Sequence, residues 1–202
     1  MAGHSLTLET SGQRRRNLSL APDSRDAFWA ELATLDGEWR AEARWGLKLR
    51  LEGEAFQYDA QDSTSFFNYR VGRGRLALRF ASRGGWTLSV GPRGEVLASG
   101  TAPSEGYREI GGAIEFETLG ERAVWSVTPA AGWRAYDAGA TAAPVDLHSS
   151  YAFYELEAFV DGALLRRLRL RALTSVRYES HTDAAQNAAS LYLSTQLRWL
   201  AH

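Results

Sequence analysis

The chain has 202 residues and a net charge of -1, because 24 acidic side chains nearly balance 23 lysines and arginines. This balance argues against partners held by bulk charge, so we expect neither nucleic acid nor a membrane as a partner. The absence of cysteine excludes disulfides, cysteine nucleophiles and thiolate metal sites.

The first 22 residues lack the apolar segment of a secretory signal, and no run in the chain reaches the ~20 apolar residues of a membrane-spanning helix. We therefore expect a cytoplasmic protein. Ser, Thr and Gly surround a basic cluster at 14–16, which predicts a flexible tail over 1–22. An edge strand through Leu6 to Leu8 is the alternative.

A short helix is expected over 24–35, because Asp23 can cap its start and Gly37 can end it. Apolar residues recur inside it at helical spacing, at Phe28, Leu32 and Leu35.

The next segment, 39–51, alternates apolar and charged residues almost without error. Successive strand residues point to opposite faces, so this pattern predicts a long strand with one dry and one wet face. Similar alternation returns around 75–80, 86–98, 114–117 and 124–136, and a hairpin over 154–172 is expected to turn at 161–163.

Thr182 can cap a C-terminal helix over 183–200, in which small and then large apolar residues form a stripe. The sequence therefore predicts a mainly β protein. Its single domain, 23–202, is expected to be an antiparallel β-barrel of about eight to ten strands with a short N-terminal and a C-terminal helix. A half-open sheet wrapped over a helix is the alternative architecture.

The junction Gly37-Glu38-Trp39, between the expected helix and the first long strand, resembles the lipocalin and wider calycin pattern. The resemblance implies an up-and-down barrel whose closed end is plugged by Trp39, with a terminal helix packed outside. It also implies a small molecule held in the interior.

If the strands close, their apolar faces point inward, and an aromatic wall suits a small hydrophobic ligand. The ligand-binding residues expected are Trp45, Phe80, Trp86, Phe116, Trp125, Asn68 and Tyr154. The interior packed solid by its own side chains is the alternative. His148 and Asp146 flank a loop end, and Tyr58 and Tyr69 border a polar turn, so these four are the candidate catalytic residues.

Three functions stay open at this point. The first is binding of a small hydrophobic or aromatic molecule in the barrel. The second is a cofactor-free cyclase or isomerase of small-molecule biosynthesis, in which the four candidate residues would guide protons. The third is an interaction module with a filled core. No cofactor or metal is expected, and a homodimer is possible.

Overall fold

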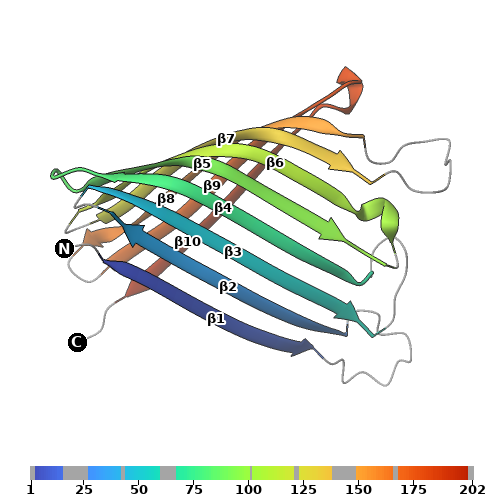
Figure 1. Cartoon of the computed structure of the whole chain (residues 1–202), viewed down its shortest axis with the longest axis horizontal. Helices are drawn as coiled ribbons and strands as arrows, with labels where there is room; N and C mark the ends of the chain where they lie inside the picture. Colours follow the sequence, from blue (N-terminus) through green and yellow to red (C-terminus); the bar gives the residue numbers. More distant parts are fainter. Residues whose placement is uncertain are drawn as a thin grey trace.

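The computed structural model describes residues 3–15, 27–41, 44–59, 67–100, 102–120, 123–137, 149–165 and 168–199. Ten strands form one antiparallel sheet in which every strand pairs with its neighbour in the chain (Figure 1). The strands are β1 (His4–Arg15), β2 (Phe28–Arg40), β3 (Trp45–Tyr58), β4 (Tyr69–Ala81), β5 (Trp86–Ala98), β6 (Tyr107–Leu119), β7 (Ala123–Tyr136), β8 (Tyr151–Leu165), β9 (Leu168–His181) and β10 (Ala188–Trp199). The helical elements of the described residues are two short 3-10 turns, η1 (Pro103–Glu105) and η2 (Ala184–Gln186).

The mainly β class is confirmed, and both predicted helices are wrong. Residues 28–40 form β2 and residues 188–199 form β10. Each segment also carries a period-2 pattern, which pairing with a neighbouring strand satisfies along its whole length. Residues 4–15, expected within a flexible tail, form the edge strand β1.

The sheet curves strongly, as ion pairs between distant strands show. Lys48 on β3 lies 3.7 Å from Glu115 on β6, and Arg93 on β5 lies 2.5 Å from Glu155 on β8. Strands three apart in a flat sheet would be separated by about 14 Å, too far for side chains that point straight up from it. The face that carries these pairs is therefore concave, and Figure 1 shows β8 to β10 behind β2 to β4.

The two faces differ in chemistry. On the concave face, charged side chains of the central strands, such as Glu109 and Arg134, are buried or half-buried beside small residues such as Ala77, Ser89 and Ala113. On the convex face, large apolar side chains stand exposed along all ten strands, from Leu6 on β1 to Trp199 on β10. The core of this protein is thus its polar side, and its apolar side faces outward.

The hairpin between β8 and β9 differs from the prediction. The chain continues as a strand through Asp161 and Gly162, and the connection falls at 166–167. The long register places Glu155 opposite Arg177 and Leu156 opposite Val176, which keeps charges on one face and apolar residues on the other.

The connections alternate in length from one end of the sheet to the other. At one end they are short, at 41–44, 82–85, 120–122 and 166–167. At the opposite end they are longer, at 16–27, 59–68, 99–106, 137–150 and 182–187. These are called the short-connection end and the long-connection end below.

The expected barrel is not closed, since within the described residues the outer edges of β1 and β10 pair with no strand. No helix in these residues has the length and apolar character needed to cross a membrane.

Candidate functional site

The convex face carries an aromatic row at the short-connection end. Neighbouring ring centroids along it are 4.9 to 5.7 Å apart, across the five strands β3 to β7. Each member is placed on this face by its strand register, and the members are Trp45, Phe80, Trp86, Phe116 and Trp125. Trp39 and Trp199 lie on the same face at the same end of β2 and β10.

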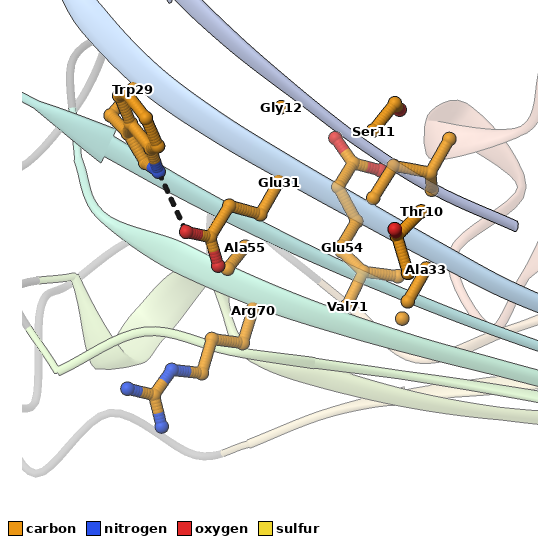
Figure 2. Close-up of a pocket in the computed structure, with 12 residues that line it drawn as sticks. Thr10, Ser11, Gly12, Trp29, Glu31, Ala33, Glu54, Ala55, Arg70 and Val71 are labelled. Carbon is orange, nitrogen blue, oxygen red and sulfur yellow. Dashed lines mark hydrogen bonds between the residues drawn. The ribbon is translucent and has the colours of Figure 1, made fainter.

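At the long-connection end the convex face becomes polar. Arg14, Glu31, Arg70 and Arg108 occupy convex register positions there, and Arg14 is paired with Asp59 at 2.6 Å. A hollow of ≈ 580 Å³ lies at this border, lined by residues of β1 to β4. Figure 2 shows the Trp29 indole N–H donating to Glu31 there.

Between the aromatic row and this charged rim, no convex position of the ten strands carries a charged side chain. The positions hold Leu, Val, Ile, Ala, Gly, Pro and Thr, together with a few aromatic rings. The convex face therefore presents a continuous apolar band with an aromatic border on one side and a charged border on the other. All seven tryptophans lie on this face.

The concave face is organised around Glu109 on β6, whose side chain is only 4 % exposed. Its carboxylate accepts hydrogen bonds from Arg134 at 2.8 Å, Arg177 at 2.9 Å and Arg93 at 3.2 Å. Arg93 and Arg177 also approach Glu155 on β8. Charge-assisted hydrogen bonds of this kind need fixed geometry, so the cluster holds the strands from β5 to β9 at one curvature.

A second concave cluster lies beside the first. Arg73 on β4 binds Glu52 at 2.5 Å, Glu95 at 2.9 Å and Glu54 at 3.2 Å. A hollow of ≈ 390 Å³ lies between the two clusters, and ten of its twelve lining residues are charged: Arg50, Glu52, Arg73, Arg75, Arg93, Glu95, Glu109, Glu155, Glu157 and Arg177. Such a lining suits water or polar solutes and disfavours an apolar ligand.

Aromatic rings gather inside the curve at the long-connection end. The ring of Phe56 lies 5.0 Å from that of Tyr58 and 5.3 Å from that of Tyr69. The Asn68 side-chain oxygen accepts from the Tyr58 backbone N–H at 2.8 Å, and the Tyr69 hydroxyl donates to Glu54 at 3.3 Å. The structure thus brings together three residues that the sequence singled out, at the mouth of the concave face.

A histidine on the same rim has a serine neighbour that the sequence did not pair with it. The Ser149 hydroxyl lies 2.5 Å from His181 Nδ1 and 2.5 Å from Gln186 Oε1, so it bridges β9 and η2. Glu179 is 3.8 Å from His181 Nε2, beyond hydrogen-bond distance, and so does not orient the imidazole as a catalytic carboxylate would. The arrangement links the rim to η2.

The other predicted site residues fall elsewhere. His148 and Asp146 lie outside the described residues. The six aromatic residues expected to line the interior, Trp45, Phe80, Trp86, Phe116, Trp125 and Tyr154, all lie on the convex face, and Tyr154 is 57 % exposed. Their expected inward placement is wrong, because the alternation of a strand tells two faces apart without saying which is inside.

Trp39 does not plug an end of the sheet. Its ring instead lies beside Gly37 on the convex face, where a Cβ on Gly37 would come 2.7 Å from the ring. The Arg and Glu clusters of the concave face were the signal that sequence reasoning missed. They lie on the face that the alternation in the sequence marks as wet, and they repeat on most strands with the same period as the apolar residues.

No protein-family model, no curated protein and no solved structure matches the chain. The resemblance to lipocalins therefore stays a prediction.

Proposed function

We propose that this protein is embedded in a lipid bilayer, with its strands crossing the hydrocarbon and its convex face in contact with acyl chains. The observation that carries the proposal is the uncharged apolar band that runs over all ten strands, between the aromatic row and the charged rim. Sheets that cross membranes alternate apolar-out and polar-in and have aromatic borders at the interfaces.

The height of the band fits a bilayer. On β3 it extends over ten residue steps, from Trp45 to Ala55. At ~3.4 Å per residue and a tilt of ~40°, ten steps span about 26 Å along the bilayer normal, close to the ~25 Å apolar band of strand-built membrane proteins.

The amount of exposed apolar surface supports the same conclusion. Leu191 and Ile110 are each 72 % exposed, and Leu193, Leu197 and Trp199 on β10 are each more than 60 % exposed. A chain in water rarely leaves a contiguous apolar patch larger than a few hundred Å² uncovered. Acyl chains would remove this surface from water.

The shape of the face favours lipid over a second copy of the chain. The apolar side is convex, so two rigid copies would touch only along a narrow line and leave most of the band in water. Fluid acyl chains follow a convex surface all round. The alternation of short and longer connections is also typical of strand-built membrane proteins.

The proposal gives the concave face a role as a polar interior shielded from lipid. Ion pairs such as Glu109 with its three arginines then lie where the surrounding sheet separates them from hydrocarbon. This replaces the expectation of a hydrophobic ligand in the interior, and it departs from the expectations of a cytoplasmic chain without a membrane partner.

Intrinsic fluorescence tests the proposal directly, because all seven tryptophans are on the convex face. The full chain is refolded with phosphatidylcholine vesicles whose acyl chains carry bromine, a short-range quencher. We expect co-flotation with the vesicles, strong quenching by bromine and weak quenching by aqueous iodide. A chain that stays outside the vesicles, or is quenched by iodide alone, would overturn the proposal.

A matched pair of single-tryptophan variants separates the two faces. One retains only Trp125, and the other has no native tryptophan and carries Phe159→Trp on the concave face. We expect bromine to quench the first variant and to have little effect on the second. Equal quenching of both would contradict the orientation proposed for the sheet.

A further inference from the structure

The two edge strands present the strongest unexplained feature of the molecule. β1 and β10 have equal lengths of 12 residues, and all side chains of both are exposed. In hydrocarbon their unpaired backbone N–H and C=O groups have no water to bind, so an open sheet edge cannot persist there. This argument rests on the proposed function.

We infer that β1 and β10 pair with each other in the bilayer, antiparallel and with Glu9 opposite Arg198. The directions are right for this pairing, because an even number of strands in an up-and-down sheet leaves the first and last antiparallel. The curvature is also in place, as shown by the ion pairs that join strands three apart.

The observed registers restrict how the edges can meet. A row of directly paired residues runs across the whole sheet from Thr7 to Ala188: Thr7, Asp36, Arg50, Arg75, Arg93, Gly111, Gly132, Phe153, Glu179 and Ala188. If Arg198 is opposite Glu9, the numbers of paired residues on the two edges add up to 207. The level of Ala188 then lies twelve residues beyond that of Thr7, where the row began.

This offset fits the geometry of a closed sheet. The tangent of the strand tilt is the offset along the strands, twelve residues at ~3.3 Å each, divided by the width across the sheet, ten strands at ~4.8 Å each. The tilt is therefore about 40°, within the ~35–45° of closed sheets. Offsets of ten and fourteen give about 35° and about 44° by the same relation. Odd offsets are excluded, because they would pair a convex residue with a concave one.

Charge selects among the three even offsets. With an offset of ten, Arg198 faces Thr7, and with fourteen it faces Ser11. Only the offset of twelve places it opposite a carboxylate, that of Glu9. In the part of the chain that the structure describes, neither side chain has an ion-pair partner, although Arg198 donates to Gln196 at 3.0 Å. The same register sets Trp199 against Leu8 on the convex face.

The lack of cysteine makes the register measurable by disulfide formation. Three double variants share Ser11→Cys on β1 and differ on β10, with Gln196→Cys, Ser194→Cys or Arg198→Cys. Directly opposed residues have Cβ atoms about 5 Å apart and diagonal ones about 7 Å or more, and a disulfide needs about 4 Å. In phosphatidylcholine vesicles we expect the Gln196→Cys variant to oxidise within one chain, about tenfold faster than the other two.

Three other results would overturn the inference. Faster oxidation of either offset variant would show another register. Disulfides formed only between chains, visible as dimers on a non-reducing gel, would mean that the edges pair with a second copy. No disulfide in any variant would mean that the edges stay apart.

A charge exchange gives an independent measurement. In the background of the Ser11→Cys and Gln196→Cys variant, Glu9→Arg should slow oxidation several-fold, and adding Arg198→Glu should restore the rate. Failure of the second change to restore the rate would contradict the Glu9–Arg198 pair.

Tryptophan quenching by brominated lipid is measured on the same samples. Quenching without the intramolecular disulfide refutes the edge pairing and leaves the membrane proposal standing. Chain that remains outside the vesicles refutes both.

Discussion

Replacement of Leu51 by arginine distinguishes a convex face in lipid from one in water. Leu51 lies on β3, six residues from Trp45 and four from Ala55, so it is near the middle of the apolar band, and it is 43 % exposed. Six steps of ~3.4 Å at a tilt of ~40° put it about 16 Å below the level of Trp45, about half the ~30 Å hydrocarbon thickness. An arginine at that depth has no aqueous surface close by.

The expected cost of Leu51→Arg in a bilayer is about 2–4 kcal/mol, the range for arginine at the midplane of a strand-built membrane protein. The matched control is Gln57→Arg on the same strand and the same face, two residues beyond the band. Near the interface the cost falls to about 0–1 kcal/mol. In water, both substitutions at exposed positions should change stability by only about 0.5 kcal/mol or less.

The assay is reversible guanidinium unfolding of each variant in phosphatidylcholine vesicles, followed by tryptophan fluorescence. A shift of the midpoint for Leu51→Arg, with little shift for Gln57→Arg, is the expected result. Equal small shifts for both would refute the argument that the band lies in hydrocarbon. A large shift for Gln57→Arg would place the border of the band elsewhere.

Two further predictions concern the concave face. Glu109→Gln should reduce the free energy of unfolding by about 3–5 kcal/mol, because it leaves three guanidinium groups around a neutral amide. The control is Asp36→Asn, since the Asp36 side chain is 44 % exposed and 4.0 Å from Arg50. This substitution should cost less than about 1 kcal/mol in the same unfolding assay. Gly132→Ala should lower the unfolding midpoint, because the added Cβ would lie 2.4 Å from the Ile110 carbonyl oxygen and 2.6 Å from the Phe153 ring. Gly72→Ala should have little effect, because no atom lies within 4 Å of the Cβ that it adds. Equal midpoints for the two variants would contradict the packing described at Gly132.

The sequence was sufficient to predict the strands from β3 to β9, although not β1, β2 and β10, and it did not show which side of the strands is inside. Alternation in 39–51 describes a two-faced strand equally well whether the apolar side meets a protein core or a lipid. What decides between the two is the contact of charges from strands far apart, such as Lys48 with Glu115, and such contacts are not visible before the sheet is assembled.

The two false helices have a related cause. Phe28, Leu32 and Leu35 satisfy helical spacing, but Trp29, Ala33 and Leu35 also fall on one side of a strand. In short apolar runs the helical and the strand periods fit equally well. Pairing with β1 and β3 makes residues 28–40 a strand. At 161–162, the Asp-Gly turn signal was overridden because continuing the strand keeps Asp161 opposite Arg171 on the charged face.

Of the candidate site, the aromatic mouth was predictable in part. Tyr58 and Tyr69 border one polar turn in the sequence and Asn68 directly precedes Tyr69, and such local proximity survives folding. The Glu109 cluster was not predictable, since its arginines come from β5, β7 and β9 and meet the carboxylate only through the registers of four strand pairs.

The pairing of every strand with its chain neighbour has a consequence for how the protein is made. Each hairpin encloses a connection that is short compared with the whole chain, so the entropy lost in closing it is small, and strands can be added one at a time. The contact between β1 and β10 encloses nearly the whole chain and so is expected to form last. A chain arrested before that step would present two bare edges and would be the form most prone to aggregate.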